Sequence, residues 1–359
     1  LSGGTRIMAI IDKPSDYFNT ILYSGTGSEN ARTGVNFQPD WVWIKQRNGS
    51  TNQMLTDSVR GATKTLHSQN TDTESTDAQA LKSFNSDGFT VGTDTDVNGA
   101  GGTGGTYVAW NWKAGTSFTN DASSTGIGSM DSAGSVNEEA GFAIVSYTGN
   151  ETASTLKHGL STVPQMIIVK GRIAARDWVV GQHTQGWTKS AYLNETNAFT
   201  NQTHWNNTAP TSSVFTIEGG SNSNVNTNNA AYISYIFSER QGYSKFGSYI
   251  GNGNADGAFV YTGFKPAFLL VKRSSQANND WNLHNNKSPG FNVNNSYLAP
   301  NDTAAEVTGN TSQIFDLLSN GFKCRGSGTG SNGSGSTYIY MAFAENPFVA
   351  SNFNAATAR

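Results

Sequence analysis

The chain repeats one pattern three times, and this repeat constrains its fold more than any other feature. A Tyr-x-Gly tripeptide opens each copy, at residues 23–25, 147–149 and 249–251. Within each copy a proline lies six positions before a lysine, at Pro39 and Lys45, Pro164 and Lys170, and Pro266 and Lys272. An aromatic run with a two-residue period closes each copy, at residues 107–112, 232–237 and 338–343. Such self-similarity indicates one structural unit built three times.

Each unit is predicted to be an antiparallel β-sandwich, because short β-rich runs alternate with Gly, Asn and Ser turns. Residues 41–44, 166–169 and 268–271 are continuously apolar, so we expect central strands that are covered on both faces. Long helices are disfavoured, since the chain holds 40 Gly among 359 residues and is also rich in Asn, Ser and Thr. Disorder is equally disfavoured, because 11% of the residues are aromatic.

The repeat also predicts the domain boundaries. We expect sandwiches at residues 1–115, 138–240 and 241–359, with a Gly- and Ser-rich linker at residues 116–137. The small polar residues of that linker indicate a flexible or loosely docked segment. The join between the second and third copies is much shorter, which predicts two packed domains and a looser first one. Leu1 is not an initiator Met, so we expect a piece of a longer chain.

Charge and cysteine content exclude several classes of protein. The net charge of −3, with 14% charged residues, supplies no basic surface for nucleic acid. The absence of a run of 18 apolar residues argues against membrane insertion. A single cysteine, Cys324, excludes an internal disulfide and a multi-cysteine metal site, and its place beside Phe322 predicts a buried small residue. Glycine-rich strings such as residues 326–335 lack a surrounding βαβ unit, so no cofactor is expected.

Longer phrases carry a resemblance to a known family. They are DYFNTILYSGTGS at residues 16–28, DSVRGATK at 57–64, YVAWNWKAG at 107–115, FVYTGFKPAFLLVKR at 259–273 and AFAENPF at 342–348. These phrases resemble repeated domains of virion-associated proteins of marine bacteriophages, described as tail fibre or structural proteins. The resemblance implies an all-β virion protein of three tandem lectin-like, jelly-roll (concanavalin-like) sandwiches, with Arg359 as a natural C-terminus. It implies no ligand and no catalytic residues.

One candidate glycan site is an Asp-Trp pair that follows the lysine strand. Asp177 precedes Trp178, with His183 nearby, and Asp280 precedes Trp281, with His284 nearby. A tryptophan ring can stack on a sugar while neighbouring polar groups bind its hydroxyls. The alternative is that both tryptophans are core residues, as Met54 and Leu55 at the matching place in the first copy suggest.

A second candidate is specific to the middle copy, where aromatic and histidine side chains lie in Asn-rich loops. Exposed aromatic residues in loops are typical of recognition surfaces, and we take this cluster as the best candidate for a glycan contact. The alternative is that these rings plug the end of the sandwich or lie between domains. The residues are His183, Trp187, Tyr192, His204 and Trp205.

A third motif resembles the start of a calcium loop. Asp94, Asp96 and Asn98 alternate before Gly99, as in D-x-D-x-N-G, but Gly105 stands where the final bidentate Glu belongs. A solvated Gly-rich turn is therefore the preferred interpretation, and no metal is expected.

Catalysis is not expected either. A glycosidase needs two carboxylates held across a cleft, and no copy places such a pair at a shared position.

The leading hypothesis is a non-enzymatic tail fibre or appendage in the virion. It is bound to other virion proteins, contacts host glycans through loops and forms a homotrimer. The alternatives are a capsid decoration or head-fibre protein that binds coat protein, and a polysaccharide-degrading tail enzyme.

Overall fold

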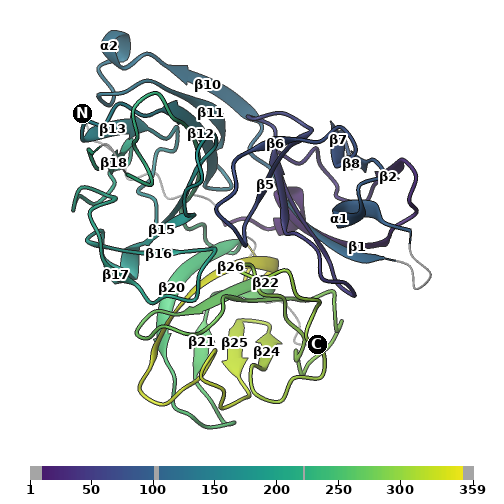
Figure 1. The fold of residues 1–359 in the computed structure, drawn as a ribbon. Coiled ribbons are helices and arrows are strands. Elements are labelled where there is room, and N and C mark those ends of the chain that lie inside the picture. The colour runs from purple at the N-terminus through teal and green to yellow at the C-terminus, as the bar shows by residue number, and fades with distance from the viewer. Residues whose placement is uncertain (1–9, 101–104, 221–222, 351–359) are drawn as a thin grey trace.

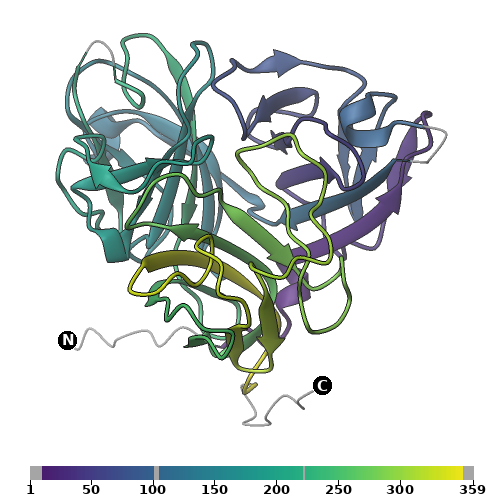
Figure 2. The ribbon, with the colours of Figure 1, turned by 60° about the horizontal axis from the view of Figure 1, so that its bottom comes forward.

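The computed structural model describes residues 10–100, 105–220 and 223–350, so the expectation for Arg359 lies outside it. The chain is all-β, with several antiparallel sheets and a few short helical turns. Figure 1 shows three lobes around a common centre, one for each sequence repeat, and Figure 2 shows the same lobes with the third brought forward. Within the described residues, no helix is long and apolar enough to cross a membrane.

The first repeat builds a six-stranded sheet and a three-stranded sheet. The larger has the order β1 (Phe18–Ser24), β9 (Thr106–Trp112), β3 (Trp41–Gln46), β4 (Met54–Asp57), β5 (Lys64–His67), β6 (Ser75–Thr76). The smaller has the order β2 (Asn30–Arg32), β8 (Gly88–Val91), β7 (Leu81–Asn85). Two short helices, η1 (Pro14–Asp16) and α1 (Thr95–Asn98), precede strands β1 and β9.

The second repeat has an eight-stranded sheet beside a two-stranded one. The larger has the order β10 (Thr116–Asn120), β11 (Ser132–Asn137), β12 (Phe142–Thr148), β19 (Ala231–Phe237), β14 (Met166–Gly171), β15 (Val179–Gln182), β16 (Lys189–Tyr192), β17 (Thr200–Asn201). The smaller pairs β13 (Ser154–Lys157) with β18 (Val214–Ile217). Helices α2 (Ala122–Thr125) and η2 (His183–Gln185) lie in its connections.

The third repeat has a four-stranded and a three-stranded sheet. The larger has the order β20 (Ser244–Ile250), β26 (Thr337–Pro347), β22 (Phe264–Arg273), β23 (Asn282–Asn285). The smaller has the order β21 (Phe259–Tyr261), β25 (Gly321–Cys324), β24 (Phe315–Leu318). The three apolar runs expected as central strands lie in β3, β14 and β22, and all twelve of their residues are buried.

The same pairing opens and closes every repeat. The strand that carries the opening tyrosine (β1, β12 or β20) pairs with the last strand of its repeat, so that the opening and closing tyrosines lie opposite each other. The rings stack in each case with centroids 5.1 Å apart; the pairs are Tyr23 and Tyr107, Tyr147 and Tyr232, and Tyr249 and Tyr338. The sequence repeat is therefore also a repeat of strand register.

One aromatic core joins the three lobes. Trp41 of the first repeat stacks on Tyr235 of the second with ring centroids 4.3 Å apart. Phe343 of the third repeat contacts Phe18 of the first at 5.2 Å and Phe237 of the second at 5.9 Å. Because all three large sheets bury one face in this cluster, the prediction of a loosely attached first domain is wrong.

The prediction of a flexible linker at residues 116–137 is also wrong. This segment forms β10, α2 and β11, and β11 pairs with β12 to extend the large sheet of the second repeat. Met130 and Val136 are buried in the core of that repeat, and Phe118 packs against it. Three apolar anchors among many small residues are enough to fix the segment, and their spacing lacks a clear period in the sequence.

Candidate functional site

A buried asparagine explains the Tyr-x-Gly tripeptide in all three repeats. The side-chain oxygens of Asn98, Asn226 and Asn332 each accept a hydrogen bond from the backbone N–H after that glycine, at 2.9 to 3.0 Å. Each asparagine is fully buried. A Cβ on Gly25, Gly149 or Gly251 would lie 2.2 to 2.5 Å from a backbone oxygen, so only glycine fits. The tripeptide is thus a structural clamp, and the sequence repeat alone does not reveal its asparagine partner.

The repeated lysine lies at the junctions between repeats. The Lys45 Nζ donates to Thr303 O of the third repeat, and the Lys170 Nζ donates to Thr71 O of the first, both at 2.9 Å. The Lys272 Nζ donates to Asn279 O, and the Asn279 N–H meets Thr196 O of the second repeat. All three lysines are buried, and burial lowers the pKa of each to about 8.

The junctions form a closed ring, in which equivalent side chains reach from each repeat to the next. The Trp178 indole donates to His67 O at 2.8 Å, from the second repeat to the first. The Trp281 indole donates to Tyr192 O at 3.0 Å, from the third to the second. The strand register places Gln53 at the equivalent position in the first repeat, so the sequence match to Met54 and Leu55 was wrong by one to two residues. Gln53 donates to Ala299 O of the third repeat at 2.9 Å. The core interpretation of both tryptophans is therefore confirmed, since each is at most 1% exposed.

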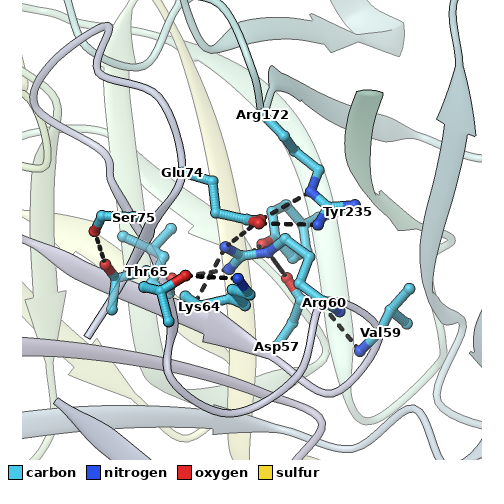
Figure 3. A network of polar contacts seen from close by, with 11 residues as sticks. Asp57, Val59, Arg60, Lys64, Thr65, Glu74, Ser75, Arg172 and Tyr235 are labelled. Atoms are coloured by element: carbon cyan, nitrogen blue, oxygen red, sulfur yellow. Dashed lines mark hydrogen bonds and ion pairs between the residues drawn. The ribbon is translucent and has the colours of Figure 1, made fainter. Parts of the chain in front are cut away.

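A buried charge network reinforces the junction between the first and second repeats (Figure 3). Arg60 pairs with Asp57 and Glu74, and Arg172 of the second repeat pairs with Glu74 at 2.8 Å. The Tyr235 hydroxyl donates to Asp57 at 2.8 Å. Burial raises the pKa of Glu74, but the hydrogen bond from Arg172 and the charge of Arg60 outweigh it and hold that pKa below its usual value. Glu74 is therefore ionised at neutral pH, as this network requires.

The predicted glycan cluster of the second repeat is largely a core cluster. Trp205 is fully buried, Trp187 is 9% exposed and meets it edge-on at 5.5 Å, and His204 is buried beside the half-buried Tyr192. The prediction of exposed loop aromatics is therefore wrong for Trp187 and Trp205. The loops fold back over the sheet, because these rings fill the space above β15, where Gly181 leaves no side chain beneath Trp205.

The remaining predicted residues hold hairpins and junctions. Asp177 accepts a hydrogen bond from Asn194 at 2.9 Å and Asp280 accepts one from Asn301 at 2.7 Å. His183 is exposed and contacts Phe246 O of the third repeat at 2.8 Å. His284 is fully buried, with its Nδ1 3.2 Å from Asn294. Of the eight predicted residues, the structure brings Asp177, Tyr192, His204, Trp187 and Trp205 near one another, within or against the core of the second repeat.

The motif that resembles a calcium loop forms α1. Asp94 caps this helical turn by accepting from Asp96 N at 2.6 Å, and Asp96 accepts from Asn52. Burial and the neighbouring Asp77 raise the pKa of Asp94 to about 7. The side-chain oxygen of Asn98 accepts the backbone hydrogen bond of the clamp described above. Among the described residues, no group of three or more His, Cys, Asp or Glu is placed to hold a metal ion.

Cys324 is fully buried, as its sequence context predicts. It lies in β25 within the core of the third repeat, and burial raises the pKa of its thiol to about 12. The thiol is therefore protonated and inert at neutral pH.

A hollow in the third repeat combines an exposed ring with polar groups. Its volume is about 530 Å³, and Phe291, which is 76% exposed, is one of the residues that line it. Lys265 at the start of β22 pairs with Glu345 near the end of β26 at 2.9 Å, and Asn286 lies beside them. Burial raises the pKa of Glu345, but Lys265 and Asn286 hold it below its usual value. We call this hollow the groove and define it by the lining residues Lys265, Asn286, Phe291 and Glu345.

The groove continues toward the first repeat. A second hollow of about 180 Å³ shares Asn286 and Glu345 and is also lined by Thr20 of β1. Three positions before the opening tyrosine, the other repeats carry Ile144 and Phe246, which fill the central core. The smaller Thr20 at this junction leaves room that the bulkier side chains occupy elsewhere.

The sequence contains a weak signal for the groove. Phe291 lies in an Asn-rich loop, at residues 287–296, as do the aromatic residues of the cluster in the second repeat. No local pattern connects this loop with Lys265 or Glu345, which come from the ends of two strands. Only the pairing of β22 with β26 brings these charges together.

Comparison with known proteins adds a family. A family model described as a domain of unknown function, DUF7483, matches residues 13–347. The match includes all three repeats, so the ring of junctions lies inside the matched region. No curated protein and no solved structure matches the chain.

Proposed function

Since the chain belongs to the DUF7483 family, whose function is unknown, we propose its role from its own geometry and sequence: a non-catalytic structural protein of a bacteriophage virion that contacts host-surface glycans. The phrase-level resemblance to marine phage virion proteins supports the virion location. The closed ring supports a structural role, because the repeated polar residues stabilise the assembly of repeats. We infer that each repeat is a sandwich of jelly-roll, concanavalin-like type.

The observation that carries the glycan contact is the groove. The Glu345 carboxylate can accept hydrogen bonds from sugar hydroxyls, Lys265 and Asn286 can donate them, and the Phe291 ring offers a face for the C–H groups of a pyranose. Glu345 is the single carboxylate among the described residues that line the two hollows. Glycoside hydrolysis requires a pair of carboxylates, so this arrangement favours binding over cleavage.

The partners proposed for this protein are other virion proteins, of the tail or the capsid, and copies of itself. The three repeats already share one core within a single chain, so a homotrimer is not needed to complete that core. The homotrimer remains a proposal that native mass spectrometry tests, since a trimer has three times the mass of the 38.2 kDa chain.

Two experiments test this function. A density map of the virion should show the chain at the tail or on the shell, and its absence from purified particles would refute the virion role. Binding of the purified protein to host polysaccharide should fall at least tenfold in Phe291→Ala, because the stacking face is lost. Ile173→Ala, at an exposed position outside the groove, is the matched control.

Unchanged binding in Phe291→Ala would reject the groove as the glycan site. Release of reducing sugar ends during incubation would reject the non-catalytic role. Because Phe291 is a surface residue, we expect its replacement to change the free energy of unfolding by less than about 0.5 kcal/mol.

A further inference from the structure

Strand β21 lies at the edge of the small sheet of the third repeat and carries exposed aromatic side chains. The strand order is β21, β25, β24, so within the part of the chain that the structure describes β21 pairs on one side only. Phe259 is 47% exposed and Tyr261 is 54% exposed, while Val260 between them is buried. An exposed apolar edge strand is a template for pairing with another chain.

The hydrogen-bond pattern shows which backbone groups face this edge. In an antiparallel pair, residues alternate between those that bond to the partner strand and those that face away from it. Cys324 N donates to Ala258 O, and Thr262 N donates to Asn320 O. The backbone groups of Ala258 and Thr262 therefore face β25. The N–H and C=O groups of Phe259 and Tyr261 therefore point to the open edge.

The second repeat shows what such an edge accepts. Leu156 of β13 pairs with Phe215 as Val260 of β21 pairs with Phe322, and both phenylalanines pack against the opening tyrosine of their repeat. Thr155 is thus equivalent to Phe259, and Lys157 is equivalent to Tyr261.

At that equivalent edge, a preceding segment of the same chain lies along β13. Ser129 N donates to Thr155 O at 2.9 Å, Thr155 N donates to the Ser129 hydroxyl at 2.9 Å, and the Ser132 hydroxyl donates to Lys157 O at 3.0 Å. Met130 forms a parallel bridge with Leu156. Both outward-facing positions of the second repeat therefore have partners from residues 127–132.

Among residues 10–100, 105–220 and 223–350, no segment covers the corresponding edge of the third repeat. Only residues 238–243 separate its first strand from β19, whereas the second repeat is preceded by the long excursion of β10, α2 and β11. The first repeat carries Ala31 and Thr33 at the outward positions, so the fold itself does not require aromatic residues there. The aromatic pair of β21 is an addition that the architecture does not explain.

A hollow beside Tyr261 completes the surface. It has a volume of about 320 Å³ and is lined by Tyr261, Lys245, Arg240 and Thr262 among others, with the Lys245 ammonium 6.0 Å from the Tyr261 ring centroid. A side chain of an added strand can enter this hollow while its backbone bonds to Phe259 and Tyr261.

We propose that β21 binds an extended segment of another polypeptide chain, which adds as a parallel strand to the open edge. The covering segment of the second repeat indicates the chemistry of that partner. The covering segment has a glycine, Gly128, at a place where a Cβ would lie 2.7 Å from Thr155 O. It also has serine hydroxyls that form hydrogen bonds to the edge strand. The partner segment is thus a short Gly- and Ser-containing strand, and its recognition is strand addition. This inference concerns a protein partner and does not depend on the glycan groove.

The test uses the full chain and a fluorescent peptide with the sequence of residues 125–133, TGIGSMDSA. We expect its anisotropy to rise on binding, with a scrambled peptide as control. Phe259→Lys, which places a charge at the edge, should weaken binding at least tenfold. Ile173→Lys introduces the same charge at an exposed apolar position elsewhere and should leave binding unchanged.

Hydrogen exchange locates the contact. In the free protein the amides of Phe259 and Tyr261 should exchange much faster than that of Thr155, and the peptide should protect them. No binding at about 1 mM peptide, the weak end of specific recognition, would overturn the proposal. Equal binding by Phe259→Lys, protection confined to the second repeat, or protection of residues 258–262 by saccharides instead of the peptide would also overturn it.

Discussion

The hydrogen bond between Tyr235 and Asp57 offers a sharp test of the junction between the first two repeats. Tyr235→Phe removes one hydroxyl and keeps the ring that stacks on Trp41. Tyr243→Phe is the matched control, because Tyr243 is equally buried and its hydroxyl has no hydrogen-bond partner among the described residues. Both changes delete the same atom from a fully buried tyrosine.

The expected magnitudes differ because the lost contacts differ. A hydrogen bond to a charged group contributes about 1.5 to 3 kcal/mol, and Asp57 lies in the buried network with Arg60, so we expect a loss of about 2 kcal/mol for Tyr235→Phe. The Tyr243 hydroxyl is buried without such a bond, so its removal should be neutral or slightly stabilising.

Urea denaturation followed by tryptophan fluorescence and by circular dichroism measures both effects. Because the three lobes share one core, we expect a single transition with coincident midpoints for the two probes. Equal unfolding free energies for the two variants, within about 0.5 kcal/mol, would refute the role of the junction hydrogen bond. Separate transitions for the repeats would refute the shared core.

Three further predictions concern stability. Gly149→Ala should destabilise the protein by about 3 kcal/mol, since the new Cβ would lie 2.2 Å from Thr227 O, and a loss of unfolding free energy below about 1 kcal/mol would contradict this close packing. The three junction lysines have a folded-state pKa of about 8, below the unfolded value of about 10.4. Between these pH values the unfolded chain binds more protons than the folded protein, so stability should rise from about pH 7.5 to 9.5. A melting temperature that does not change over this range would contradict the burial of the lysines. Glu74, with a lowered pKa, stabilises the fold above its unfolded pKa and loses this effect as pH falls, so Glu74→Gln should lower stability at pH 7 and flatten the acid limb, and parallel curves for variant and parent would exclude that role.

The sequence determined the repeat, the all-β class and the central strands, because these depend on spacing and apolar runs within one copy. Period-two aromatics identified the closing strands, and the lysine interval located a shared position, although its role at the junctions was not apparent. The sequence did not predict which loop aromatics are exposed to solvent. Trp187 and Phe291 both lie in polar loops, yet Trp187 is buried and Phe291 is exposed. Loop composition does not report whether the chain folds back over its own sheet.

Only the tertiary structure decided how the three units meet. The aromatic faces of the three large sheets are buried against one another in one core and not in three separate ones. The segment predicted to be a linker forms two strands of the second repeat. The groove and the open edge of β21 likewise depend on contacts between segments far apart in the chain. Periodicity shows which face of a strand is apolar, because side chains alternate along it, but it does not show which surface will cover that face.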